Sequence, residues 1–184
     1  MEKQYTLSVL TEDSPGLLNQ VTIIFSRRKM NLDSLNVSTS EVRGISRFTI
    51  VCTSTRDAID KVCGQIRKIV DVLGAFVYED DEIFYQEIAL YKVPTRVFLN
   101  GEKIETLVRN NGARILVVEE EHIVIEKTGH KKETHDLYEK LEPYGLLEFI
   151  RSGRVAISKS TRRTEAYIKE LEESRSNTLS IKDY

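Results

Sequence analysis

The sequence predicts an α+β protein built from two βαββαβ units in series. Three observations support this fold class. The 184 residues suffice for one large domain or two small ones, since domains usually contain about 100 to 150 residues. In the first 78 positions, strand-like alternation and helix-like spacing of apolar residues follow one another in the order strand, helix, strand, strand, helix, strand. A similar order of elements then recurs from Tyr85.

The first three elements are expected between residues 5 and 38. Leu7 and Val9 alternate with polar neighbours and predict a strand. An amphipathic helix of about thirteen residues follows, with a second strand from Asn31 to Ser38 that is irregular near its start. The helix stripe consists of Leu17, Leu18, Val21, Ile24 and Phe25.

The next three elements complete the first unit. Ile45, Phe48, Ile50 and Cys52 predict a strand that pairs with the preceding one beyond a turn at Gly44. Ser54 and Asp57 have the spacing of a capping box and predict the start of a second helix. Its stripe consists of Ile59, Val62, Ile66 and Ile69, and Leu73, Ala75 and Val77 alternate as a closing strand. This order is that of the ferredoxin-like plait, in which two helices cover one face of a four-stranded antiparallel sheet.

The second unit has a similar order. A strand runs through Ile88 and Leu90, and Gly101 delays the first helix until Glu102. A hairpin over 113–127, a helix with Leu137 and Leu141, and a strand over 146–150 complete the unit. The expected domains are therefore 1–78 and 85–158, with an acidic linker at 79–84 and a charged tail at 159–184 that is helical or disordered.

Composition excludes several classes of function. The formal charge of −2 argues against a nucleic-acid-binding protein, whose domain is normally basic. No apolar run approaches the roughly 20 residues of a membrane helix, and the first residues lack the features of a signal peptide. Cys52 and Cys63 are expected to be buried free thiols in a reducing cytosol, which predicts a cytoplasmic protein.

No pattern of catalytic residues is present in the sequence. His122, His130 and His135 match no zinc-ligand spacing, and neither standard glycine-rich phosphate loop occurs. The acidic clusters at 79–82 and 119–121 have the character of solvated turns. We therefore expect no catalytic residue, no metal site and no cofactor.

The turn between the first strand and the first helix is the candidate binding site. A strand that passes through Pro15 and Gly16 directly into a helix leaves the first backbone N–H groups of that helix without acceptors, at its positive dipole end. Such a turn can hold a carboxylate, and Asn31 can accept a hydrogen bond from the ammonium group of the same free amino acid. Proline followed by glycine before a helix is also common without any ligand, so both interpretations remain open at this point.

Longer stretches of the chain resemble a known family. The segment 9–41, from VLTEDSPG to VSTSE, resembles the opening of an ACT domain, a plait that binds amino acids in regulators of their metabolism. FSRRKMNLDSLNV, KIVDV, QEIAL and FIRSGRVAISKS together resemble the small regulatory subunit of acetolactate synthase, also called acetohydroxyacid synthase. The resemblance covers residues 4 to 158 and is strongest in the first 78 residues and at 151–158.

This resemblance implies a specific role. Such a subunit has no active site, binds the thiamine-diphosphate-dependent catalytic large subunit and raises its activity. It also transmits feedback inhibition by valine or a related branched-chain amino acid, and it forms a homodimer through its ACT domains. The implied effector-binding residues are Asp13, Gly16, Leu17, Leu18, Asn31 and Leu32. The family often has a neutral residue at the position of Asp13, whose carboxylate would repel that of the effector unless it turns away or pairs with the ammonium.

Two other functions are compatible with a plait. A stand-alone ACT-domain amino-acid sensor could regulate another partner, although a transcriptional sensor would need a DNA-reading helix pair and a basic face. A small acyl-phosphate hydrolase would be expected to carry an arginine in the first loop, where this chain has Asp13.

Overall fold

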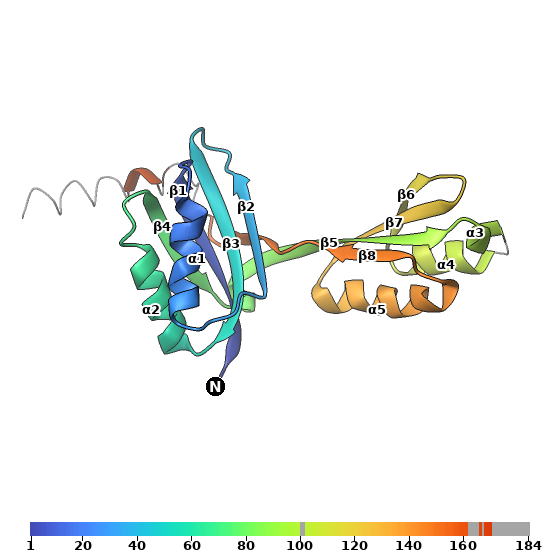
Figure 1. The fold of residues 1–184 in the computed structure, drawn as a ribbon, viewed down its shortest axis with the longest axis horizontal. Helices are drawn as coiled ribbons and strands as arrows, with labels where there is room; N and C mark the ends of the chain where they lie inside the picture. The colour runs from blue at the N-terminus through green and yellow to red at the C-terminus, as the bar shows by residue number, and fades with distance from the viewer. Residues whose placement is uncertain (100–101, 162–165, 167, 171–184) are drawn as a thin grey trace, which may run out of the picture. The chain divides into compact units, whose positions relative to one another are not determined.

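The computed structural model describes residues 1–99, 102–161, 166 and 168–170. The chain forms two compact units, Met1–Phe84 together with the residues from Ala156 onward, and Tyr85–Val155. Each unit contains an antiparallel sheet and helices interleaved with its strands (Figure 1). The predicted fold class, α+β with tandem ferredoxin-like plaits, is confirmed. None of the helices in the described part of the chain is long and apolar enough to cross a lipid bilayer.

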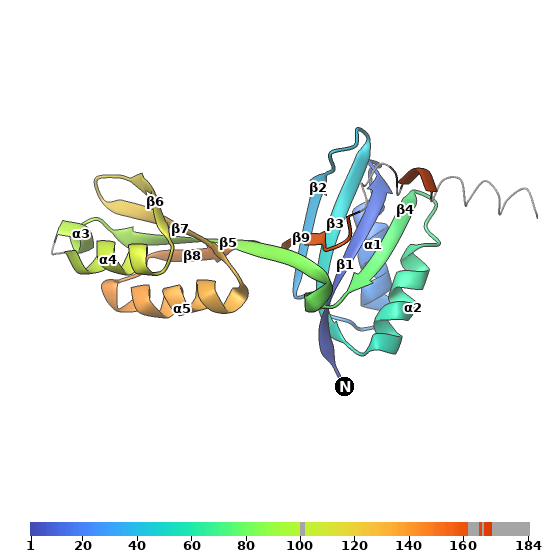
Figure 2. The same cartoon turned by 180° about the vertical axis from the view of Figure 1, so that it is seen from behind.

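The first unit contains all six predicted elements. These are β1 (Lys3–Glu12), α1 (Leu17–Arg27), β2 (Ser34–Thr39), β3 (Ile45–Ser54), α2 (Arg56–Ile66) and β4 (Val72–Tyr78). The strand order is β2-β3-β1-β4, and both helices cover the same face of the sheet (Figures 1 and 2). Tyr5, Leu7 and Val9 of β1 alternate onto that face and are buried in the core between sheet and helices.

Helix α1 is shorter than predicted, with 11 residues. Its core stripe buries Leu17, Val21 and Phe25. The helix ends in a Schellman motif, in which the Lys29 N–H donates to the Ser26 carbonyl and the Met30 N–H donates to the Phe25 carbonyl, both at 3.0 Å. Lys29 adopts a left-handed backbone with φ of 54°. Sequence spacing continued the helix too far because it cannot detect a left-handed residue that is not glycine.

Two predicted element starts are wrong by a few residues. Thr55, not Ser54, caps α2, and its side chain accepts a hydrogen bond from the Ala58 N–H. Ser54 instead continues β3, where it pairs with Lys3. Strand β2 begins at Ser34 rather than Asn31, and the residues before Ser34 form the connection between α1 and the sheet.

The closing strand contains an irregularity that the sequence pattern missed. The β1–β4 register shifts where Leu10 opposes Gly74 and Thr11 opposes Val72. As a result Val72 and Ala75 face the helices, whereas Leu73 faces the other side of the sheet. There Leu73 packs with Leu10 and Ile168. The prediction that Leu73, Ala75 and Val77 share one face is therefore wrong at Leu73, because a bulge inverts the alternation.

The acidic segment 79–84 is folded in the first unit. Asp80–Glu82 forms a 3-10 helix (η1), in which the Glu79 N–H donates to a carboxylate oxygen of Glu82. Lys159 holds this turn, because its N–H donates to the Glu82 carbonyl and its ammonium donates to the Asp81 carbonyl. Residues 156–158, expected in the second domain, belong to the first compact unit. Most of the predicted tail, 162–165, 167 and 171–184, lies outside the described residues.

The second unit also contains the predicted elements. They are β5 (Ile83–Pro94), α4 (Glu102–Asn110), β6 (Arg114–Val118), β7 (His122–Gly129), α5 (Lys131–Leu141) and β8 (Glu148–Arg151), with two additions, α3 (Arg96–Leu99) and the 3-10 helix η2 (Glu142–Tyr144). The strand order is β6-β7-β5-β8, and β9 (Val155–Ser158) pairs with β5. Tyr91, Ile125, Leu137 and Leu141 are buried in its core. Helix α4 begins at Glu102, as Gly101 predicted.

Candidate functional site

The turn after β1 is attached to the neighbouring strand β3. The Asp13 N–H donates to the Gly44 carbonyl at 2.9 Å, and the Ser46 hydroxyl donates to Asp13 Oδ1 at 3.2 Å. The Ser14 N–H folds back onto the Glu12 carbonyl at 3.0 Å. These contacts fix the direction in which the chain enters Pro15 and Gly16.

The first turn of α1 has backbone N–H groups without acceptors in the helix. Gly16 precedes the helix with φ of 83°, a left-handed backbone that favours glycine, and no side chain caps this end. The Gln20 N–H makes the first helical hydrogen bond, to the Gly16 carbonyl at 3.2 Å. The N–H groups of Leu17, Leu18 and Asn19 therefore have no acceptor within the helix. The first turn contains no acidic side chain, so the electrostatics of this end favour an anion.

Four of the six expected site residues lie at this turn. Asp13 and Gly16 are exposed, and the Leu18 side chain is 44% exposed. Leu17 is only 2% exposed and belongs to the core. Leu17 can therefore offer a ligand only its backbone N–H, whereas Leu18 also presents an apolar side chain at the surface.

The other two expected residues lie at the opposite end of α1. Asn31 and Leu32 follow the helix, which at 11 residues is about 16 Å long. The neighbouring Asp33 carboxylate accepts hydrogen bonds from Gln4 at 3.0 Å and Thr53 at 2.9 Å, which places this connection near the start of β1. Gly16 follows the end of β1. Within one chain the Gly16 turn and Asn31 therefore lie at opposite ends of α1.

Two polar residues near the turn were missed by sequence reasoning. Ser46 orients the Asp13 carboxylate through a side-chain hydrogen bond, which depends on strand pairing that the sequence does not reveal. Thr11 is fully buried, and its hydroxyl has no hydrogen-bond partner among the described residues. Thr11 continues the inward alternation of Leu7 and Val9, so a polar residue at a core position was the available signal.

The described residues offer no constellation for metal or thiol chemistry. They contain no group of three His, Cys, Asp or Glu side chains that could hold a metal ion. Cys52 and Cys63 are free and buried, as predicted. Burial raises the pKa of Cys52 to about 12 and also raises the pKa of Cys63, so both thiols are protonated at neutral pH.

Comparison with known proteins identifies the family. Residues 7–74 match the acetolactate synthase small-subunit-like ACT domain, and residues 86–160 match the family of the small subunit of acetolactate synthase. The acetolactate synthase small subunit of Mycolicibacterium smegmatis is 37% identical over 158 residues, which cover 86% of this chain and 92% of that protein. The chain belongs to the acetolactate synthase small-subunit family.

Family members with lower sequence identity match this chain over nearly the same length. The acetolactate synthase small subunit of Bacillus subtilis is 30% identical over 168 residues, covering 89% of this chain and 94% of that protein. The crystal structure of the small subunit from Thermotoga maritima superposes with a TM-score of 0.78 at 26% identity, over 87% of this chain and 99% of that one. Membership in this family supports a regulatory subunit of acetolactate synthase and implies a catalytic large subunit as its partner.

Proposed function

We propose that this chain is the non-catalytic regulatory subunit that activates the large subunit of acetolactate synthase and makes it sensitive to feedback inhibition. Valine or a related branched-chain amino acid is the proposed effector. Its carboxylate is bound by the N–H groups at the start of α1, and Asp13, Gly16, Leu17, Leu18, Asn31 and Leu32 form the proposed site. The observation that carries the proposal is the uncapped first turn of α1 behind Gly16.

The separation of Gly16 and Asn31 supports a site shared by two chains. Strand β2 is an edge of the first sheet, and in both views α1 lies between α2 and that edge (Figures 1 and 2). A two-fold axis at this edge would pair two β2 strands antiparallel and would also place the two α1 helices antiparallel. The Gly16 end of one helix would then lie beside the Asn31 end of the other. A homodimer joined in this way forms two equivalent sites and covers an otherwise open strand edge.

Asp13 has a defined place in this proposal. Its Oδ1 accepts a hydrogen bond from Ser46, so the carboxylate is held toward β3. In that position it can accept from the ammonium of the effector, whose carboxylate lies on the helix. We therefore expect Asp13→Asn to weaken valine binding in calorimetry. Tighter binding would instead mean that Asp13 repels the effector carboxylate.

The proposal is tested by reconstituting the chain with its catalytic large subunit and measuring acetolactate formation with and without valine. We expect the chain alone to be inactive, to raise turnover of the large subunit several-fold and to transmit inhibition by valine. Gly16→Asp should abolish the valine response because it adds bulk and charge at the turn. Gly145→Asp is the matched control, because Gly145 has the same φ of 83° and lies in the second unit.

The outcomes separate the proposed function from its alternative. Retained valine inhibition in Gly16→Asp would exclude the assigned site. Valine binding by the isolated chain, together with no effect on the synthase, would instead favour a stand-alone amino-acid sensor. Sedimentation of the free chain as a monomer at all effector concentrations would contradict the shared site.

A further inference from the structure

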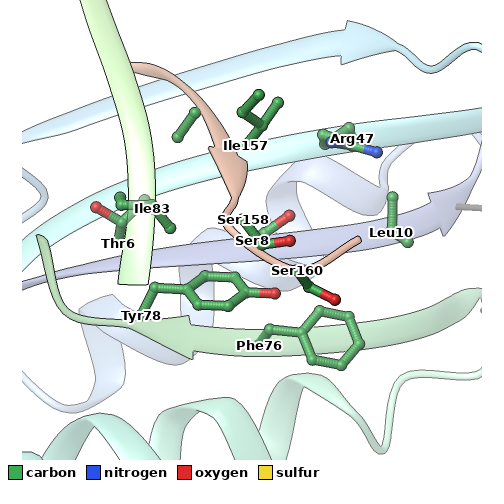
Figure 3. Close-up of a pocket in the computed structure, with 11 residues that line it drawn as sticks. Thr6, Ser8, Leu10, Arg47, Phe76, Tyr78, Ile83, Ile157, Ser158 and Ser160 are labelled. Atoms are coloured by element: carbon green, nitrogen blue, oxygen red, sulfur yellow. The ribbon is translucent and has the colours of Figure 1, made fainter. Parts of the chain in front are cut away.

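A cavity of about 340 Å³ lies on the face of the first sheet opposite to α1 and α2. Its floor comes from three neighbouring strands, and its cover comes from Ile83 and from residues 156–160, which cross this face (Figure 3). The floor residues are Thr6, Ser8 and Leu10 of β1, Arg47 of β3, and Phe76 and Tyr78 of β4. Volumes of about 300 to 1,000 Å³ are typical of small-molecule sites, so this cavity is at the small end of that range.

The cavity is separate from the proposed effector turn. Ser8 alternates with Leu7 and Val9 along β1, so the cavity faces away from the helices that those two residues contact. None of the six proposed effector-binding residues lines it. A ligand in this cavity would therefore occupy a different site from one bound behind Gly16.

The charge of the lining favours an anion without an amino group. Among the lining residues that the structure describes, Arg47 has the one charged side chain, and 23% of that side chain is exposed. Its Nη2 is 3.7 Å from the carboxylate of Glu41, which is 61% exposed and does not line the cavity. A guanidinium has five N–H donors in a planar fork, so Arg47 can bind a ligand carboxylate in addition to its contacts within the protein. The described lining residues include no carboxylate, so none of them offers an ionic partner to an ammonium group.

The remaining lining residues favour a compact ligand with an apolar part. Phe76 and Tyr78 have ring centroids 6.5 Å apart, and Leu10, Ile83 and Ile157 add aliphatic surface. Hydroxyl groups of Ser8, Ser158 and Ser160 provide donors and acceptors, and Ser158 hydrogen-bonds to Tyr78. Lining of this kind can bind both an apolar body and a carbonyl or hydroxyl oxygen.

We infer that this cavity is a second ligand site, for a small 2-oxo or 2-hydroxy monocarboxylate with a compact apolar body, closed by residues 156–160. Arg47 binds the carboxylate, the serine hydroxyls bind the adjacent oxygen, and the aromatic and aliphatic side chains contact the apolar body. Because 156–160 form the cover, occupancy of the site stabilises this segment on the first sheet.

The test compares two probes with the same carbon skeleton, 3-methyl-2-oxobutanoate and L-valine. The first has an oxo group at carbon 2, and the second has an ammonium group there. Methyl NMR spectra of the full chain report the cavity through Ile83 and Ile157 and the helix turn through Leu18. We expect the oxo acid to shift the two isoleucine signals saturably and valine to leave them unchanged. The response of the Leu18 methyl signals to valine tests the effector turn separately, so each of the two proposed sites can be contradicted without the other.

Three variants complete the experiment. Arg47→Gln removes the cation and Ser8→Phe fills the cavity, and each is expected to weaken binding of the oxo acid by about tenfold or more. Arg43→Gln is the matched control, an exposed arginine in the same hairpin that does not line the cavity. Circular dichroism verifies that each variant is folded. Unchanged affinity in Arg47→Gln, equal isoleucine shifts with valine, or no saturable shift up to about 10 mM oxo acid would overturn the inference.

Discussion

At the scale of single residues, two glycines of the first unit both have space for a side chain, but only one of them has a backbone conformation that favours glycine. Gly16 has φ of 83°, whereas Gly64 lies within α2, and an added Cβ meets nothing within 4 Å at either position. Steric crowding is thus absent at both, and only the backbone conformation distinguishes them. Glycine is required behind the proposed binding turn and is merely tolerated in the helix.

This difference predicts stability changes of opposite sign. Gly16→Ala should lower the free energy of unfolding by about 1 to 2 kcal/mol, because a Cβ disfavours the left-handed region. Gly64→Ala should raise it by about 0.5 to 1 kcal/mol, because alanine is the better helix former. Urea denaturation of both variants measures the two changes. A stabilising Gly16→Ala would contradict the left-handed backbone on which the uncapped turn depends.

A buried carboxylate of the second unit is also a residue-scale feature. Glu87 is 7% exposed and lies between two arginines, with Arg151 Nε 3.1 Å from its Oε2 and Arg154 Nε 3.9 Å from its Oε1. Arg154 also lies over the ring of Tyr85, at 3.8 Å from the centroid. Both arginines lie in the segment FIRSGRVAISKS, which contributes to the resemblance of the sequence to its family, so this part of the segment has a structural role.

Removal of the negative charge of Glu87 should destabilise the protein. Glu87→Gln leaves two guanidinium groups without their carboxylate in a buried site, and we expect it to lower the free energy of unfolding by about 3 kcal/mol or more. Glu148→Gln breaks a 2.7 Å pair with Lys92 that is open to solvent, and it should leave the urea midpoint almost unchanged. Similar midpoints for the two variants would show that Glu87 is not an essential partner of the arginines.

At the scale of elements, the start of α2 shows how accurately a capping pattern in the sequence predicts the first residue of a helix. Thr55 accepts a hydrogen bond from the Ala58 N–H at 3.4 Å, whereas Ser54 is a strand residue. Thr55→Ala should therefore lower the free energy of unfolding by about 1 kcal/mol. Ser54→Ala, at the position that the sequence pattern favoured, should lower it by less than Thr55→Ala does, because the cap of α2 is Thr55. The reverse order in thermal unfolding would restore Ser54 as the cap.

At the scale of the whole molecule, the described residues form one main hydrophobic core in each unit, besides the small cluster of Leu10, Leu73 and Ile168. The first contains Ile59 with both cysteines, and the second contains Leu137, and the two share no residue. Both thiols are buried and have raised pKa values, so they react with a thiol reagent only when the first core opens. Thiol reactivity is therefore a specific probe of the first unit.

Core truncations should affect this probe differently. Ile59→Ala and Leu137→Ala each remove a fully buried side chain and should lower stability by about 2 to 5 kcal/mol. We expect Ile59→Ala to accelerate the reaction of Cys52 with an aromatic disulfide at pH 8 by tenfold or more, about 1.4 kcal/mol per tenfold. Leu137→Ala should leave that rate unchanged. Equal acceleration in both variants would mean that the two cores open together.

The sequence by itself determined the order of the elements, the inward faces of most strands and helices, and the turn at Gly16, because side-chain periodicity and turn residues are local properties. It could not locate the inversion at Leu73, the left-handed Lys29 or the Ser46 contact to Asp13, since each depends on strand register or backbone conformation. Only the tertiary structure showed how the turn before Gly16 is held, through the Gly44 and Ser46 contacts to Asp13. These contacts join residues about thirty positions apart in the sequence, and local patterns of side chains do not encode which strands will pair.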